Sequence, residues 1–178
     1  MTVWTIGHGT RTALDFIALL TAQGVVRLVD VRTVPRSRHN PQFNRDRLPD
    51  DLTRAEIAYV HMPGLGGLRR PRSDSVNTGW RNDGFRGYAD YMQTPEFRTN
   101  LDALLRQAGT AATAIMCAET VPWRCHRSLI ADAVTVRQVD VRHIMTAERA
   151  DRHRLTAWAR IQDERIEYPG HASTDRSA

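Results

Sequence analysis

The sequence predicts an α/β fold built on a mostly parallel sheet of about five strands. Short apolar runs alternate along the chain with segments of helical periodicity, which is typical of parallel sheets covered by helices. The first strand–helix–strand unit spans only residues 3–31, which indicates a right-handed parallel crossover. With 178 residues, the chain is long enough to bury the core of one domain.

Each element of this first unit has its own local signal. Residues 3–6 are an apolar run that ends at a glycine-rich turn, which predicts a strand and its exit. Thr12 followed by Asp15 is a capping box that opens a helix, and Gly24 is a natural C-terminal residue for that helix. Residues 25–31 are apolar apart from two charged positions and predict the second strand.

The middle of the chain is rich in loops. Residues 32–44 contain many Pro, Arg and Asn residues and predict a loop. A short helix over 48–56 and a third strand over 57–60 are expected next. Residues 63–83 predict a long irregular stretch, and such stretches in compact domains are usually functional or mobile.

The second half returns to alternating helices and strands. The expected elements are helices over 84–92, 95–107 and 124–135, strands over 111–117 and 139–145, and a docked helix around 155–161 before a frayed end. Thr94 and Pro95 form the start of the second helix, which we expect to end before Gly109. One α/β domain is therefore expected over residues 1–150, and residues 151–178 belong to it as a C-terminal helix and tail.

The charge of the chain comes from arginine alone. The net charge is +5, and the sequence contains no lysine, which excludes Schiff-base chemistry and a P-loop lysine. Nine arginines lie within residues 32–72. They form either a solvated, ion-paired surface or an electropositive mouth for a phosphate-bearing ligand or nucleic acid, because guanidinium groups suit phosphate and carboxylate.

The sequence predicts a cytoplasmic protein that does not contact a membrane. No apolar run approaches the roughly 18 residues that span a bilayer. The first residues lack the basic region of a signal peptide. In a reducing compartment, Cys117 and Cys125 are expected to be free thiols.

The stretch from residue 116 to residue 127 concentrates the reactive side chains. It holds both cysteines, an acid, a histidine and two arginines between a predicted strand and a predicted helix. In open α/β sheets, ligands bind at the carboxyl ends of the strands. The same edge should collect His8 after the first strand and Asp30 and Arg32 after the second.

Cys125 is a candidate nucleophile because of its expected position. We place Cys125, His126 and Arg127 in the first turn of a helix, where unpaired N–H groups and the helix dipole lower a thiol pKa and bind anions. The alternative is a small residue packed under the loop.

Cys117 at the strand end is either a core residue or the nucleophile, with Cys125 resolving it. The spacing does not match the phosphotyrosine phosphatase pattern Cys-x5-Arg, since six residues separate Cys117 from Arg124 and one separates Cys125 from Arg127. The short cradle of rhodaneses does not match either.

Three further side chains have two interpretations each. Glu119 is a general acid or base, or the ion-pair partner of Arg124 or Arg127. His8, between two glycines, is a proton-transfer group or a hydrogen-bonded turn residue. His126 belongs to the site or caps the helix.

A metal site is the third interpretation of the cysteines. Cys117, Cys125, His126 and His8 would supply two sulfurs and two nitrogens. The spacing Cys-x7-Cys-His is not a recognised zinc pattern, because structural zinc sites usually show tighter pairs. We therefore predict no metal and no cofactor.

Several motifs taken together resemble the DUF488 family. They are Thr5-Ile6-Gly7-His8, Leu28-Val29-Asp30-Val31-Arg32 with Pro35 and Ser37-Arg38, Leu65-Gly66-Gly67, Phe85 with Tyr88 and Tyr91-Met92, and Met116-Cys117-Ala118-Glu119 with Cys125-His126-Arg127. They run in order from residue 5 to about residue 145. Gly9 stands where many relatives have Ser. The resemblance implies a Rossmann-like three-layer domain whose motif residues form one site, and it supplies no reaction.

The leading hypothesis is an enzyme, a hydrolase or transferase, that acts on a phosphate-bearing small molecule or nucleic acid. The candidate catalytic residues are Cys125, Cys117, His8, Glu119 and His126. The candidate anion-binding residues are Asp30, Arg32, Arg36, Ser37, Arg38, Arg124, Arg127 and Tyr88. One alternative is a non-catalytic nucleic-acid-binding module that uses Trp80, Tyr88 and Tyr91 with the arginine-rich loops. The other is a thiol redox or metal-binding sensor.

Overall fold

The computed structural model describes residues 1–170 and has a six-stranded central sheet. The strands are β1 (Thr2–Gly7), β2 (Arg27–Asp30), β3 (Ala58–His61), β4 (Thr113–Cys117), β5 (Asp140–Ile144) and β6 (Ala150–Arg152), in the spatial order β3-β2-β4-β1-β5-β6. The first five strands are parallel, and β6 pairs antiparallel with β5. The predicted parallel α/β sheet is confirmed, with one short antiparallel strand added at its edge.

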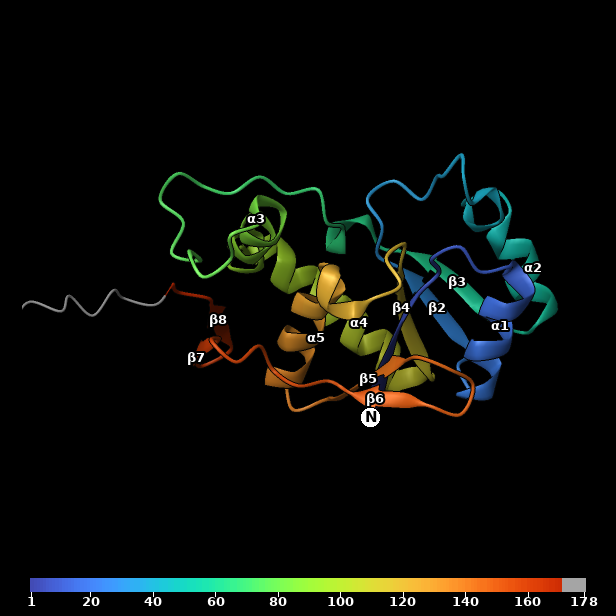
Figure 1. Ribbon diagram of the computed structural model, residues 1–178. Coiled ribbons are helices and arrows are strands. Elements are labelled where there is room, and N and C mark those ends of the chain that lie inside the picture. Colours follow the sequence, from blue (N-terminus) through green and yellow to red (C-terminus); the bar gives the residue numbers. More distant parts are fainter. Residues whose placement is uncertain (171–178) are drawn as a thin grey trace, which may run out of the picture.

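Helices cover both faces of the sheet (Figure 1). They are α1 (Ala13–Ala22), α2 (Leu48–Arg54), α3 (Asp83–Met92), α4 (Pro95–Thr110) and α5 (Arg127–Val136). The side chains of α1 and α2 share one core cluster, and those of α3, α4 and α5 share the other. This is the expected Rossmann-like three-layer arrangement. Within residues 1–170, no helix is both long enough and apolar enough to cross a membrane.

The local signals at both ends of α1 and at the start of α4 behave as predicted, but the end of α4 does not. The hydroxyl of Thr12 accepts a hydrogen bond from the N–H of Asp15 at 3.0 Å, and Gly24 adopts a φ of +67°. Thr94 caps α4 in the same way. The exception is the end of α4, which continues through Gly109 to Thr110. A helical glycine costs only about 1 kcal/mol, and the buried face of α4 outweighs that cost.

The start of α5 differs from the prediction. The helix begins at Arg127, because Pro122–Arg124 form a separate 3₁₀ helix and Cys125 is extended, with φ −132° and ψ 143°. The N–H of Cys125 bonds to the carbonyl of Pro122 and closes that 3₁₀ turn. Cys125 therefore lies before the helix and does not occupy its first turn.

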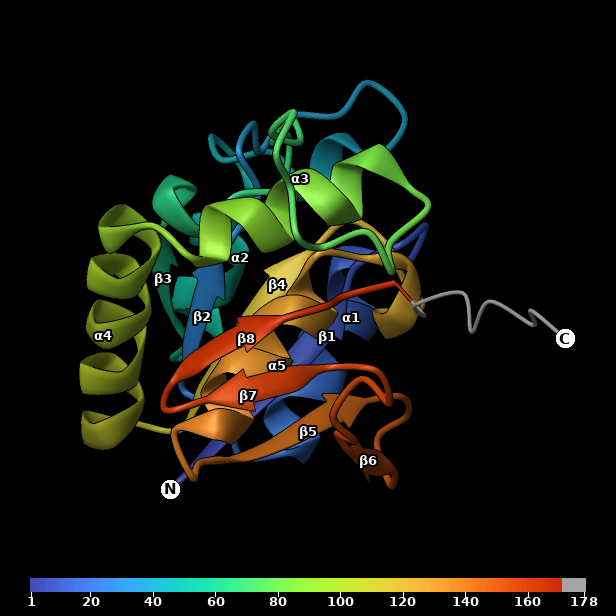
Figure 2. The ribbon, with the colours of Figure 1, turned by 90° about the vertical axis from the view of Figure 1, so that its left-hand side faces the viewer.

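The predicted helix around residues 155–161 is wrong. The chain instead forms the antiparallel hairpin of β7 (Arg160–Gln162) and β8 (Arg165–Glu167), which lies across the outer side of α5 (Figure 2). Asp163 makes the turn with a φ of +54°, a conformation that Asp tolerates better than most residues. Ile166 of the hairpin is buried against the α5 layer. The predicted frayed end lies outside the described residues from 171 onward.

The long irregular stretch is held in place by a buried carboxylate. Asp90 on α3 accepts hydrogen bonds from the backbone N–H of Arg72, the hydroxyl of Ser75 and the side-chain amide of Asn77, at 2.8, 2.6 and 2.7 Å. Asn77 in turn accepts from the N–H of Tyr168. These bonds replace the regular backbone ladder that the segment lacks.

A second buried carboxylate anchors the segment after β6. Asp132 on α5 is fully buried and accepts hydrogen bonds from the Thr156 N–H and hydroxyl, the Tyr168 hydroxyl and Nε2 of His153. Nδ1 of His153 lies 2.9 Å from Nε2 of His143 on β5. Asp132 of α5 therefore holds the segment from His153 to Tyr168, and no sequence pattern marked this side chain as structural.

The strand order places a switch point between β1 and β4. These strands are adjacent and parallel, yet β1 leads to α1 on one face while β4 leads to α5 on the other. Chains that diverge in this way leave a crevice at the carboxyl ends of the strands, and ligands of open α/β sheets bind there. Figure 1 shows the loops after β1, β2 and β4 gathered at this edge.

We expect Asp132→Asn to lower the free energy of unfolding by about 2–4 kcal/mol, since an amide nitrogen would face donors that now bond a buried carboxylate. Urea unfolding followed by circular dichroism measures this. Asp102→Asn is the matched control, because Asp102 is 41% exposed in its ion pair with Arg137 and its loss should cost less than about 1 kcal/mol. Equal losses in the two variants would contradict the anchoring role.

The stability should also fall in acid because of His143. Burial lowers the pKa of His143 from 6.5 to about 4. Between these values the unfolded chain takes up a proton that the folded chain does not, so lowering the pH from 6.5 to 4 should remove about 3 kcal/mol of stability. Above pH 6.5 this contribution is constant. His143→Gln should flatten the pH dependence of the urea midpoint, and an unchanged slope would refute the assignment.

Candidate functional site

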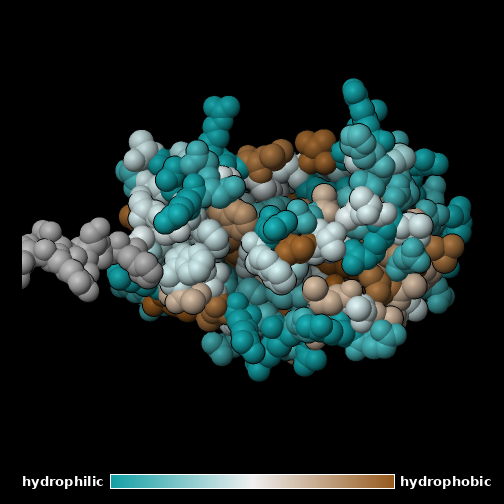
Figure 3. Space-filling view, in the orientation of Figure 1, coloured by the Kyte–Doolittle hydropathy of each residue, from teal (hydrophilic) through white to brown (hydrophobic). Residues whose placement is uncertain are grey.

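A cleft of about 520 Å³ lies at the switch point, at the carboxyl ends of β1, β2 and β4. It is lined by His8, Gly9, Thr10, Arg32, Val34, Arg36, Ser37, Asn40, Ala118, Glu119 and Thr120. Hydrophilic side chains project from this edge of the molecule (Figure 3). Three loops that are far apart in the sequence therefore build one polar cleft.

Arg32, which lines the cleft, belongs to a buried ion pair. Arg32 donates from Nε and Nη2 to the two oxygens of Asp30, at 2.9 and 2.7 Å, and from Nη2 to the carbonyl of Phe43 at 2.6 Å. The hydroxyl of Tyr59 also donates to Asp30, at 2.7 Å. Such a fork is stable in the interior only when its polar atoms are satisfied, as they are here. Asp30 does not line the cleft, and its role is to fix Arg32.

His8 is committed to the same network. Its Nδ1 lies 2.8 Å from the carbonyl of Gly9, and a carbonyl only accepts, so Nδ1 carries the hydrogen. Its Nε2 then accepts from Nη1 of Arg32 at 3.2 Å. The ring stacks on Phe43 with centroids 4.3 Å apart, and burial lowers the pKa of His8. His8 is therefore neutral and positions Arg32, with no free nitrogen for proton transfer.

Arg127 holds the loop after β4. It is 1% exposed and donates to the main-chain carbonyls of Glu119 and Thr120, at 2.6 and 2.8 Å. A Cβ on Gly7 would lie 1.9 Å from the Glu119 carbonyl, so this close approach of loop and strand requires glycine. The carboxylate of Glu119 pairs with neither Arg124 nor Arg127 in the described chain. It is exposed, lines the cleft and accepts from the N–H of Val121.

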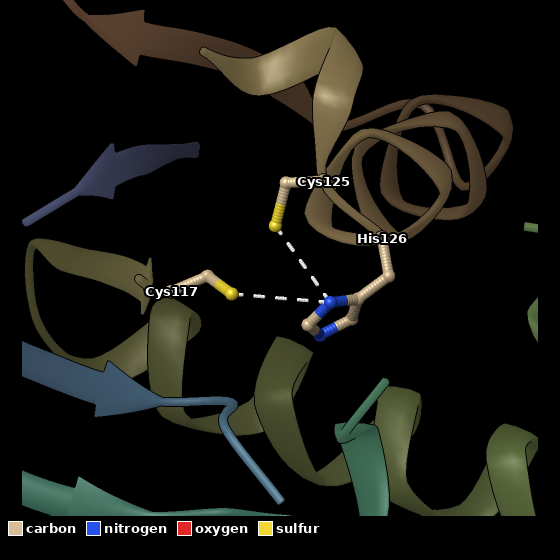
Figure 4. Close-up of side chains that lie close together, drawn as sticks. All are labelled: Cys117, Cys125 and His126. Carbon is tan, nitrogen blue, oxygen red and sulfur yellow. Dashed lines mark hydrogen bonds between the residues drawn. The ribbon is translucent and has the colours of Figure 1, made fainter. Parts of the chain in front are cut away.

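The cysteines form a separate cluster with His126 (Figure 4). Nδ1 of His126 lies 3.9 Å from the sulfur of Cys117 and 3.7 Å from that of Cys125. Both thiols are buried, and neither lines the cleft. Cys117 points toward the layer of α3, α4 and α5, on the opposite side of the sheet from His8 and its stacking partner Phe43.

The two thiols share their charge. A hydrogen bond from Cys125 lowers the pKa of Cys117, and the positive charge of Arg127 lowers it further. The same pairing and burial raise the pKa of Cys125. The pair therefore titrates as a unit, with the negative charge on Cys117. Cys125, which is the favoured nucleophile from sequence, is the thiol that keeps its proton, because it donates a hydrogen bond to Cys117 and is buried.

The structure divides the predicted site residues into three groups. The cleft brings together His8, Arg32, Arg36, Ser37 and Glu119. The thiol cluster contains the buried Cys117 and Cys125 and the half-buried His126. The remaining candidates lie outside the cleft lining: Asp30, Arg127 and Tyr88 are buried supports, and Arg38 and Arg124 are exposed. Tyr88 bonds the Leu65 carbonyl and contacts the ring of His126.

Sequence reasoning missed several members of the site. Thr10, Asn40 and Thr120 also line the cleft, and each lies one or two residues from a predicted site residue. Phe43 and Tyr59 support His8 and Asp30. No local pattern marks these two, because each acts through a contact with another segment.

Fold and site together define a Rossmann-like α/β protein with an arginine-bearing polar cleft at the switch point of its sheet. The family model described as "Domain of unknown function DUF488" matches residues 12–134, which is more than half of the chain. The protein belongs to this family. The searches of curated proteins and of solved structures each found no match.

The shared charge of the thiol pair is measurable. In metal-free protein, Cys125→Ala should raise the pKa of Cys117, because its hydrogen-bond donor is lost. Cys117→Ala is the reciprocal control and should lower the pKa of Cys125, because its charged partner is gone. Ultraviolet thiolate absorbance against pH reports both. A Cys117 pKa that stays the same or falls in Cys125→Ala would disprove the pairing.

Proposed function

We propose that this protein is an enzyme, a hydrolase or transferase, that binds the phosphate group of a nucleotide or nucleic acid in the switch-point cleft. The observation that carries the proposal is the lining itself. It combines two arginines, three hydroxyl groups, one side-chain amide and one carboxylate at the sheet edge where α/β proteins bind ligands.

Arg36 is the side chain best placed to bind the phosphate. It is exposed in the cleft, and within residues 1–170 no acidic side chain forms an ion pair with it. Arg32 differs, because its charge is neutralised by Asp30 and three of its nitrogens are already bonded. Ser37 and Thr10 supply neutral donors beside Arg36. One free guanidinium with nearby hydroxyls suits a phosphate group.

Glu119 is the proton acceptor that the cleft offers. Its carboxylate is exposed among the cationic and neutral groups, whereas both nitrogens of His8 are occupied. In the proposed reaction, Glu119 takes the proton of an attacking water or alcohol while that oxygen bonds to phosphorus. The bond from phosphorus to the leaving oxygen breaks, and the leaving oxygen takes a proton from solvent. The cysteines take no part in this step, since neither reaches the cleft.

The nucleic-acid-binding module is less well supported, because its aromatic side chains are occupied. Tyr88 and Tyr91 are 0% and 7% exposed. Trp80 packs between Phe85, Trp158 and Tyr168. Side chains that stack on each other inside the protein do not offer a platform for bases.

We also propose the cytoplasm as the compartment. The ligand atoms of Cys117, Cys125 and His126 lie within 4.8 Å of one another, and both cysteines are free thiols. Thiols this close stay reduced in the cytoplasm and are readily oxidised outside it.

Matched variants of the arginine-rich loop test phosphate binding. Arg36→Gln should raise the Kd for nucleotides about tenfold, or about 1.4 kcal/mol, in titration calorimetry. Arg38→Gln, two residues along and outside the cleft lining, should change it less than about twofold. Glu119→Gln should keep binding and lower turnover of phosphate esters about 100-fold or more. Equal effects of the two arginine variants, or full turnover in Glu119→Gln, would overturn the proposal.

A further inference from the structure

The cluster of Cys117, Cys125 and His126 has no role in the cleft, although it brings together two sulfurs and a nitrogen. All three ligand atoms lie within 4.8 Å of one another (Figure 4). Cys117 ends β4, and Cys125 and His126 follow the 3₁₀ helix of residues 122–124, so the loop after the strand folds back to bring the three together. The residue types are those that soft cations prefer.

The distances between the atoms are close to those around one zinc ion. Zn–S bonds of 2.3 Å and Zn–N bonds of 2.0–2.1 Å at tetrahedral angles place sulfur and nitrogen about 3.6 Å apart. The observed separations from Nδ1 are 3.9 Å to Cys117 and 3.7 Å to Cys125. Shifts of a few tenths of an ångström in these side chains would complete the coordination.

The imidazole of His126 is held in the orientation that a metal ligand needs. Its Nε2 lies 3.3 Å from the carbonyl of Val31. Because a carbonyl only accepts, Nε2 carries the hydrogen, and the lone pair of Nδ1 faces the two sulfurs. A backbone carbonyl behind a ligating histidine is the usual outer partner at metal sites.

Gly67 leaves room on the ligand side of this ring. A Cβ at this position would lie 3.0 Å from Nδ1 and 3.4 Å from Cε1 of His126. Gly67 closes the Leu65-Gly66-Gly67 motif, which does not line the cleft. The motif therefore has a physical role at the cluster, where it keeps the coordinating nitrogen uncrowded.

We propose that Cys117, Cys125 and His126 bind one Zn²⁺ ion and leave its fourth position to an exogenous ligand. His8 is not the fourth ligand, because its Nε2 accepts from Arg32 and its Nδ1 bonds Gly9. Three protein ligands are typical of zinc sites that keep an open position. Within residues 1–170, the hydrogen bonds of the Arg127 guanidinium go to main-chain carbonyls alone, so its positive charge favours anionic thiolates in the neighbouring cluster. The metal site and the phosphate cleft use different residues, and neither proposal depends on the other.

Metal content and cobalt spectroscopy test the site in the full chain. Protein purified without chelators should contain about one zinc per chain by elemental analysis. Metal-free protein titrated with Co²⁺ should develop thiolate-to-cobalt charge-transfer absorption and strong tetrahedral d–d bands at one equivalent, which excess Zn²⁺ removes.

Variants assign the ligands. Cys117→Ser, Cys125→Ser and His126→Asn should each weaken Zn²⁺ binding at least about 100-fold in chelator competition. Loss of a residue that only hydrogen-bonds to a ligand typically weakens binding by about 10- to 100-fold. Gly67→Ala, which keeps all three ligands, should weaken it less, because it only crowds Nδ1. His39→Asn, on an exposed residue outside the cluster, is the matched control and should bind like the parent chain. Circular dichroism of each metal-free variant checks folding.

Three results would overturn the proposal. One is the absence of a thiolate-to-cobalt charge-transfer band when metal-free protein is titrated with Co²⁺. Another is zinc affinity that survives Cys125→Ser and His126→Asn in folded protein. The third is a Cys117–Cys125 disulfide in protein purified from cells grown under reducing conditions. Loss of both titratable thiols would show it, and the pair would then be a redox couple.

Discussion

The buried fork between Arg32 and Asp30 is the interaction on which the cleft depends. It joins the end of β2 to the carbonyl of Phe43 and, through Tyr59, to β3. It also sets His8 at the end of β1, so three chain segments meet at one guanidinium. Removing either charge would leave the other buried and unpaired, which costs far more than the pair contributes. The geometry of the site is therefore inseparable from the stability of the sheet edge.

Arg127 has the matching role at the end of β4. Its guanidinium holds the carbonyls of Glu119 and Thr120, which turns the Glu119 carboxylate away from the ion pair that its charge would suggest. After Thr120 the chain reaches Cys125 on the opposite face of the sheet, where its thiol lies beside that of Cys117. One strand end thus serves two environments. The carboxylate faces the polar cleft, and the adjacent thiol faces the apolar layer beneath α5.

Local patterns predicted the elements whose ends depend on a single residue. Thr12, Gly24 and Thr94 end or begin their helices as expected, because a side-chain hydroxyl or a positive φ acts over three or four residues. The prediction failed where distant contacts decide. The sequence predicts a helix around Trp158, but the backbone N–H and hydroxyl of Thr156 bond Asp132 on α5, 24 residues away, and the chain continues into a hairpin that turns at Asp163.

The sequence by itself determined the parallel α/β class, the carboxyl edge of the sheet as the place of the site, and five of the side chains that line the cleft. Strand exits follow from chain order, since parallel strands bring their ends to one edge. Only the tertiary structure decided what those side chains do. Whether His8 has a free nitrogen depends on Arg32, 24 residues away, and which thiol keeps its proton depends on the pairing of Cys117 with Cys125. Side-chain partnership is set by packing in three dimensions, and periodicity along the chain does not encode it.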